Sequence, residues 1–132
     1  MNSNISLTGT LHYNELQNLL NETSWANNRE ISDLKIMVEN SNIVITVFDS
    51  KNQKLIGFAR VLTDYIFRAS IWDVVVDHHY HGQGIGQLIM NNILNHSELI
   101  KVSKFWLFTQ DKCPFYEKFG FKSVSGSMVL DR

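Results

Sequence analysis

The 132 residues, 44% of them hydrophobic and 19% charged, predict one folded domain that spans residues 1–132 and argue against a disordered chain. A formal net charge of −1, without any run rich in lysine or arginine, argues against a nucleic-acid partner. The single cysteine, Cys113, excludes an internal disulfide, and no apolar run resembles a signal peptide or a membrane span, so we expect a cytoplasmic protein with no membrane partner.

The first third of the chain predicts a short strand and two helices. Ile5 and Leu7 alternate with polar neighbours, as in a strand. Apolar residues then recur at helical spacing in two groups, which residues 25–28 separate. The two groups are Tyr13, Leu16, Leu19 and Leu20, and Ile31, Leu34, Met37 and Val38.

Three strands are expected next. The segment 43–48 is apolar and rich in β-branched residues, which is typical of a strand buried on both faces. A polar turn over 49–53 leads to a partner strand over 55–62, which forms a hairpin with it. A polar break around Asp64 precedes a third strand over 70–76.

The last part of the chain predicts two helices and two strands. A helix with one apolar face begins near Ile85, a strand covers 104–108, and a short helix around Tyr116 ends at Gly120. A final strand is expected over 121–130. The order β-α-α-β-β-β-α-β-α-β indicates an α/β (α+β) domain with a mixed sheet and helices on both faces.

The segment that joins the third of these strands to the next helix is rich in glycine. Gly82, Gly84 and Gly86 leave the backbone without side chains, so its N–H groups can converge on an anion at a helix N-terminus. Phosphate is the expected ligand. The dinucleotide motif would need glycine where Gln87 stands, and the P-loop ending is absent. The alternative is a turn that only allows the strand and helix to pack closely.

Two motifs resemble those of the GNAT superfamily of acyl-CoA N-acyltransferases. The stretch 74–86 resembles its Q/R-x-x-G-x-G/A motif, with His81 in the leading position, and the stretch 114–121 resembles its F-Y-E-K-L-G-F ending. The resemblance implies the family's fold, with a mostly antiparallel sheet splayed between the fourth and fifth strands. It also implies acetyl-CoA as co-substrate.

A finer likeness concerns the acceptor. Trp25, residues 55–60 and residues 71–77 are similar to plant plastid and cyanobacterial members, described as arylalkylamine (serotonin) or protein-lysine acetyltransferases. This likeness implies transfer of an acetyl group to a small primary amine. The alternatives are a protein lysine or N-terminus, and a module that senses acyl-CoA without turnover. Family members often form homodimers, so a homodimer is a further expectation.

The resemblance also implies the residues that contact the cofactor. The pantetheine arm is expected to pair with the backbone of the third long strand where it splays, and the pyrophosphate is expected on the glycine-rich loop. The implied residues are Val75, Val76, His81, Gly82, Gln83, Gly84, Ile85, Gly86, Gln87 and Tyr116.

Two residues are candidates for proton transfer. Tyr116 matches the family tyrosine that protonates the leaving thiolate, the alternative being simple packing with its aromatic neighbours. Asp73 shares a strand face with Val75 and Asp77, and it either accepts the proton of the amine or forms structural bonds, for example with Arg60.

Substrate and metal contacts complete the predictions. The segments expected to border the acceptor pocket supply Trp25, Arg60, Asp64 and Tyr65. The run Asp77, His78, His79 and His81 invites a metal interpretation, but adjacent histidines rarely face one ion and no second group of ligands is visible in the sequence. We therefore expect no metal.

Overall fold

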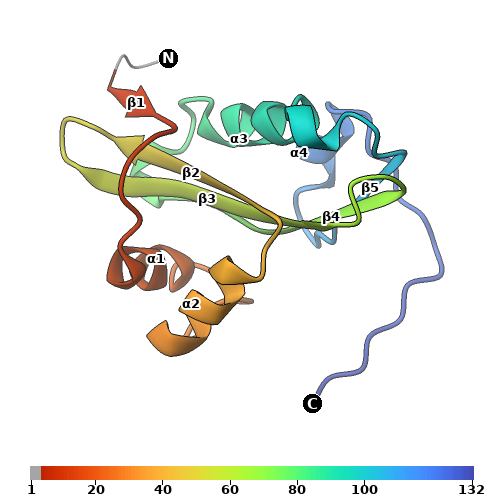
Figure 1. Ribbon diagram of the computed structural model, residues 1–132, viewed down its shortest axis with the longest axis horizontal. Coiled ribbons are helices and arrows are strands. Elements are labelled where there is room, and N and C mark those ends of the chain that lie inside the picture. The colour runs from red at the N-terminus through yellow and green to blue at the C-terminus, as the bar shows by residue number, and fades with distance from the viewer. Residues whose placement is uncertain (1–3) are drawn as a thin grey trace.

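The computed structural model describes residues 4–132, which form a five-stranded sheet with helices on both faces (Figure 1). The strands lie in the order of the sequence, and each of the first three neighbouring pairs is antiparallel, whereas the last pair is parallel. This confirms the predicted mixed, mostly antiparallel sheet. The strands are β1 (Ile5–Ser6), β2 (Ile43–Asp49), β3 (Lys54–Thr63), β4 (Arg68–Val76) and β5 (Lys104–Trp106).

The helices divide between the two faces of this sheet, as predicted. The N-terminal helices α1 (Tyr13–Leu20) and α2 (Ile31–Glu39) cover one face, and α3 (Ile85–Leu94) and α4 (Cys113–Glu117) cover the other (Figure 1). Two short 3₁₀ turns, η1 (His78–Tyr80) and η2 (Ser97–Leu99), flank α3. Each face of the sheet therefore has its own apolar core.

The position of α3 depends on a close approach to β3. A side chain at Gly57 would lie 3.2 Å from side-chain atoms of Ile85, Ile89 and Val47, so a larger residue would push the helix or these side chains away. Ile85 and Ile89 are themselves fully buried, and burying each such side chain contributes about 1.5–3 kcal/mol. This packing fixes the N-terminus of α3 at the end of β4.

A β-bulge in β4 changes which of its side chains point to each face of the sheet. The register with β3 shifts between Phe58 and Arg60, and Asp73 adopts a left-handed backbone conformation, with φ of 56°. Before the bulge, Ile71 packs in the core under α3; beyond it, Val75 packs in the core with α1 and α2. The bulge thus turns Asp73 and Val75 toward α1 and α2.

The parallel pairing of β4 with β5 is short. It joins 68–70 of β4 to Lys104–Trp106, while β4 continues to Val76. The two strands therefore separate beyond Ser70, which confirms the splay expected between the fourth and fifth strands.

The final strand predicted over 121–130 is wrong. No strand is assigned in this segment of the described chain, and Val124, Met128, Val129 and Leu130 are exposed. Its apolar residues fit a strand pattern, but a strand needs a hydrogen-bonded neighbour, and the edge strand β5 offers only three residues. The strand predicted over 104–108 is observed only over Lys104–Trp106.

Among residues 4–132, no helix combines the length and the apolar character that a bilayer span requires.

Candidate functional site

The glycine-rich loop lies between η1 and the N-terminus of α3. Gly82 and Gly84 have φ of 79° and 80°, and a side chain built at either would meet no atom within 4 Å. Glycine is thus required there for backbone conformation, not for packing. Gly86 differs, because a side chain there would lie 3.2 Å from the Phe115 ring. The packing alternative therefore explains Gly86 but not the other two glycines.

This loop leaves donors free at the start of α3. Gly84 is the N-cap and makes no side-chain cap, and the first amides of a helix have no partner within it. The first intrahelical bond described in the loop runs from the amide of Leu88 to the carbonyl of Gly84. His81, Gly82, Gln83 and Gly84 are all exposed. Exposed amides with the positive end of the helix dipole suit a phosphate group.

Side chains at the two ends of η1 hold the loop in place. Asp77 is buried. Its carboxylate accepts a hydrogen bond from the amide of His79 at 2.8 Å and forms an ion pair with Nζ of Lys54 at 3.0 Å. Burial raises the pKa of Asp77, but the His79 amide and Lys54 outweigh it, so the net pKa is lowered. The Tyr80 hydroxyl donates to Oδ2 of Asp49 at 2.5 Å.

His81 points back at the strand. Its Nε2 lies 2.9 Å from the carbonyl oxygen of Val76, and because a carbonyl only accepts, Nε2 carries the proton. The side chain therefore closes the loop onto β4, which explains how histidine can stand at the head of the motif.

Val75 and Val76 lie in the part of β4 that β5 does not pair with. Val75 is buried against the α1 and α2 core, and Val76 is half-buried under α3. On the other side, both residues pair with β3, where Gly57 faces Val76 and Phe58 faces Val75. The β5 side of this segment is the one edge of β4 where an extended ligand can add backbone hydrogen bonds.

Tyr116 lies on α4 with its ring in the core under α3. The residue is 9% exposed, and its ring meets those of Phe115 and Phe121 edge-on at 5.0 and 6.1 Å. Its hydroxyl makes no hydrogen bond to any described residue. Because every fully buried polar side-chain atom of the described residues has a partner, the hydroxyl oxygen is not fully buried and reaches the surface. Burial, with Asp111 adding repulsion, raises its pKa, so the phenol keeps its proton.

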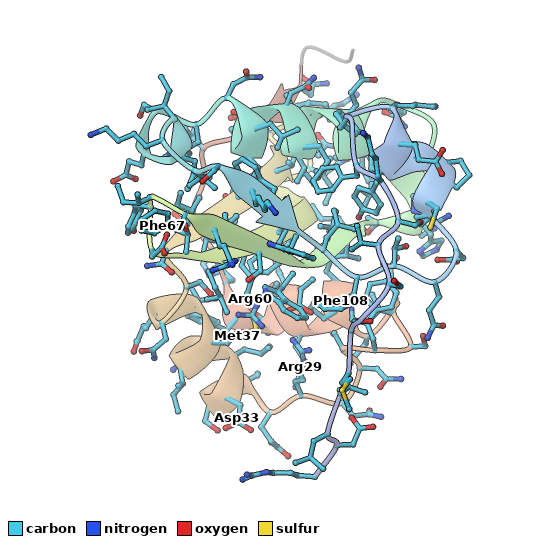
Figure 2. The ribbon with its side chains drawn as sticks, turned by 90° about the vertical axis from the view of Figure 1, so that its right-hand side faces the viewer. Arg29, Asp33, Met37, Arg60, Phe67 and Phe108 are labelled. Carbon is cyan, nitrogen blue, oxygen red and sulfur yellow. The ribbon has the colours of Figure 1, made fainter. Side chains whose placement is uncertain are left out.

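Asp73 is held by two arginines. Its carboxylate accepts two hydrogen bonds from Arg29, at 3.0 and 3.3 Å, and one from Nε of Arg60 at 2.8 Å. The Asp73 side chain is 4% exposed. Figure 2 shows Arg29 reaching from the segment before α2 toward Arg60 on the sheet. Two guanidinium groups therefore share Asp73 as their counter-ion, which is the structural role that the sequence left as the alternative.

The remaining predicted substrate residues separate into two places. Trp25 is 60% exposed, in the segment between α1 and α2 that also carries Arg29. Asp64 and Tyr65 lie in the turn between β3 and β4, roughly 20 Å from Asp73 along β4. One Asp64 oxygen accepts hydrogen bonds from three amides of that turn, of residues 66–68, which lower the pKa of its carboxyl.

The structure adds aromatic residues that the sequence analysis did not single out. Asp64 lines a hollow of about 480 Å³ together with Trp106 and Phe108. The Phe108 ring also lies 5.5 Å from that of Trp72, next to the bulge. Figure 2 labels Phe108 on the side that also carries Arg29. The aromatic content of 104–108 was the available signal, but only the β4–β5 pairing shows where it lies.

Comparison with known families agrees with this geometry. The family model described as the acetyltransferase (GNAT) family matches residues 13–121, which contain the glycine-rich loop, Asp73 and Tyr116. The chain belongs to the GNAT family of acetyltransferases. Membership confirms the resemblance of both motifs and the N-acetyltransferase class of the enzyme.

Similar sequences within the GNAT family come from algae and plants. The chain is 35% identical over 120 residues to the N-acetyltransferase ycf52 of Pyropia yezoensis, an alignment that covers 89% of this chain and 68% of the relative. It is 30% identical over 125 residues to histone acetyltransferase TAP1 of Glycine max, of which it covers 54%, with 87% of this chain aligned. It therefore spans only about half of that longer relative.

Solved structures share the GNAT fold. A Staphylococcus aureus protein superposes with a TM-score of 0.82 at 24% identity, over 97% of this chain and 99% of the other. The GNAT family protein SP0256 of Streptococcus pneumoniae superposes with a TM-score of 0.77 at 20% identity, over 97% of both chains. These likenesses concern the fold alone. The expected cytoplasmic location and homodimer stay predictions.

Proposed function

We propose that this GNAT enzyme transfers the acetyl group of acetyl-CoA directly to a primary amine, with the pyrophosphate of the cofactor on the backbone of His81–Gly86. The observation that carries the proposal is the pair Gly82 and Gly84. Both have left-handed backbones with open space at the N-terminus of a ten-residue helix. Gln87, in the first turn of α3, is near enough to contribute its amide.

The residues divide the chemistry between them. Acetyl-CoA supplies the thioester that carries the acetyl group. The backbone of Val75 and Val76 on the free edge of β4 orients the pantetheine arm, and an amide of this pair polarises the carbonyl that is attacked. Tyr116 gives its proton to the sulfur of the leaving group, since its raised pKa keeps the phenol protonated at neutral pH.

Asp73 receives a positioning role in this proposal. Its bonds to Arg29 and Arg60 tie the segment before α2 to β3 and β4, next to the bulge. With Asp73 engaged, the proton of the attacking amine passes to water. The base is therefore solvent in this mechanism, and Asp73 keeps the wall of the acceptor site in shape.

The acceptor proposed first is a small amine with an aromatic group. The hollow lined by Trp106 and Phe108 offers aromatic faces, and Asp64 on its rim offers a carboxylate to a cation. Trp25, Arg60 and Tyr65 are proposed at the borders of the path from this hollow to the bulge. The second candidate is a protein amine, which the name of the soybean relative, a histone acetyltransferase, supports.

The test measures free thiol released from acetyl-CoA in the presence of single amines: tryptamine, serotonin, spermidine and a lysine peptide. The first proposal predicts the highest kcat/KM for the two aromatic amines, and the second candidate predicts it for the peptide. Binding of acetyl-CoA with no release across the panel would favour a sensor and contradict the proposed reaction.

A further inference from the structure

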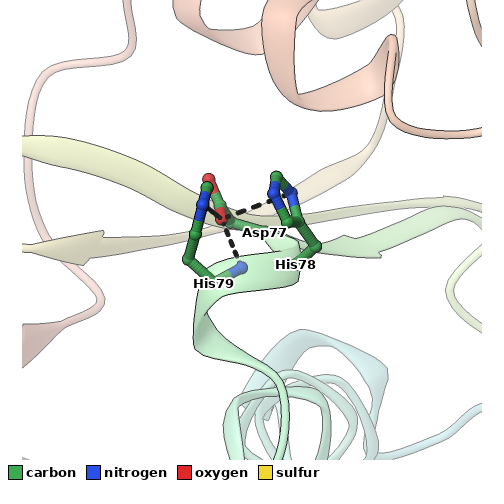
Figure 3. A group of neighbouring side chains, drawn as sticks. All are labelled: Asp77, His78 and His79. Carbon is green, nitrogen blue, oxygen red and sulfur yellow. Dashed lines mark hydrogen bonds and ion pairs between the residues drawn. The ribbon is translucent and has the colours of Figure 1, made fainter.

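A cluster of metal-ligating side chains lies just before the glycine-rich loop. Asp77, His78 and His79 each offer one ligand atom, and these atoms all lie within 4.8 Å of one another. Figure 3 shows both imidazole rings turned toward the same carboxylate. Oδ1 of Asp77 is 3.9 Å from Nδ1 of His78 and 3.2 Å from Nδ1 of His79. The 3₁₀ turn η1 thus brings adjacent histidines to one point, contrary to what their spacing suggested.

A fourth candidate ligand atom, an oxygen, comes from a distant part of the chain. Glu22 follows α1, and its Oε1 lies 3.0 Å from Nδ1 of His78. The same oxygen accepts a hydrogen bond from the amide of His78 at 2.9 Å, which fixes the orientation of this carboxylate. The sequence analysis found no second group of ligands because Glu22 precedes the histidines by more than fifty residues.

The spacing of the Asp77, His78 and His79 atoms is close to that around a tetrahedral ion, and Glu22 contacts one of them, Nδ1 of His78. Zinc binds imidazole nitrogen and carboxylate oxygen at about 2.0–2.2 Å, so neighbouring ligand atoms around it lie about 3.3–3.6 Å apart. Nδ1 of His78 lies 3.0 Å from Oε1 of Glu22 and 3.9 Å from Oδ1 of Asp77, and this Oδ1 lies 3.2 Å from Nδ1 of His79. A shared ion requires His78, His79 and the Glu22 carboxylate to rotate toward one point, and the two histidine side chains, 62% and 68% exposed, have room to do so.

The surroundings support a cation as well. Two carboxylates face one ammonium, that of Lys54, so the cluster holds an excess of negative charge when both imidazoles are neutral. Lys54 contacts Oδ2 of Asp77 in the manner of an outer-shell partner, while Oδ1 accepts the His79 amide and keeps a second lone pair for the ion. Glu22, Lys54 and Asp77 also line a surface cleft of about 400 Å³, which gives an ion a route from solvent.

We propose that Glu22, Asp77, His78 and His79 bind one divalent transition-metal ion of the zinc type. The ion ties the end of α1 to η1, two residues before His81. Its site is separate from the acetyl-transfer groups, none of which it includes, and its role is to hold the base of the loop. Imidazole and carboxylate donors select zinc or cobalt over calcium and magnesium.

The test uses tag-free protein treated with EDTA and then dialysed. Titration with Co²⁺ is expected to produce the visible absorption bands of a tetrahedral ion, saturating at one equivalent, and Zn²⁺ is expected to abolish them by competition. The variants His78→Gln, His79→Gln and Glu22→Gln should each weaken Co²⁺ binding by at least about tenfold. Since both histidines are exposed, the two histidine variants should keep the fold.

The matched control is His96→Gln, which removes the imidazole that caps η2, and it should leave the titration unchanged. A second measurement is the unfolding temperature, which Zn²⁺ should raise in wild-type protein and in His96→Gln but not in the double variant His78→Gln/His79→Gln. Absence of saturable Co²⁺ binding, or binding that survives the double variant, would overturn the proposal. Neither readout uses acetyl-CoA, so failure here leaves the proposed reaction untouched.

Discussion

The two polar residues predicted to transfer protons lie on opposite faces of the sheet, in opposite surroundings. Asp73, on the α1–α2 face, is bound by two guanidinium groups, whereas Tyr116, in the core under α3, has a hydroxyl with no partner among the described residues. The amides of residues 82–85 resemble Tyr116 in this respect, because no hydrogen bond joins them to another part of the described chain.

The contrast indicates how each group contributes. A polar group whose hydrogen bonds are satisfied within the fold stabilises that fold, and it has little capacity left for a ligand. A group that the fold leaves without a protein partner is available to bind a ligand. Four substitutions test this contrast.

The largest effect is expected from Asp73→Asn. Asparagine tolerates the left-handed backbone at this position, so the change removes mainly the charge. Because Arg29 and Arg60 lose their counter-ion and Arg29 is partly exposed, we expect the free energy of unfolding to fall by about 3 kcal/mol, at the low end for a buried pair. Urea denaturation measures it, with exposed Asp33→Asn as control. Unchanged stability with kcat lowered about 100-fold would instead make Asp73 a base.

Gly84→Asp tests the free amides of the loop. The new side chain strains a left-handed position and sets a negative charge beside the pyrophosphate, so the affinity for CoA should fall by about 100-fold. Calorimetric titration with CoA measures this affinity. The matched control is Gly126→Asp, since Gly126 also has positive φ and open surroundings but lies in the C-terminal tail. Equal affinity in both variants would place the pyrophosphate elsewhere.

Tyr116→Phe tests the unpartnered phenol against a partnered one. Loss of the general acid should lower kcat by about 100-fold while the free energy of unfolding stays unchanged. Tyr80→Phe should show the reverse, with kcat preserved and stability lowered by about 1 kcal/mol, because the Tyr80 hydroxyl donates to Asp49. Steady-state kinetics and urea denaturation of both variants separate these outcomes, and similar kcat values in the two variants would remove the distinction.

The smallest effect is expected from His81→Gln. Glutamine carries the amide donor that the family motif has at this position, and it can reach the Val76 carbonyl that His81 now contacts. The affinity for CoA should change by less than about threefold, as calorimetry can show. A much larger loss would mean that the imidazole itself binds the cofactor.

Much of the fold could be predicted from the sequence because its elements carry local signals. The helical spacing around Leu16 and Leu34, and the apolar runs of β2 to β4, predict elements within one or two residues of those observed. The strand predicted over 121–130 failed because strand formation depends on a neighbouring edge, which the local pattern does not contain.

The site was predictable where backbone conformation is encoded by residue type, as at Gly82 and Gly84. It was less predictable where it depends on contacts between distant segments. Arg29 reaches Asp73 across 44 positions, and the bulge that turns Asp73 toward it has no signature in residues 70–76. The same limit applies to Trp106 and Phe108, which reach the hollow only through the β4–β5 pairing.

The most direct measurement is kcat as a function of pH for the wild-type enzyme and Tyr116→Phe, expressed as the ratio of the two rates. The ratio cancels the titration of the amine, which both enzymes share, and reports the phenol alone. Because burial raises the pKa of Tyr116, the ratio should stay high from neutral pH to about pH 10 and fall only above it. A ratio of one at every pH, or a fall that is complete below about pH 9, would contradict the assignment of Tyr116 as the proton donor.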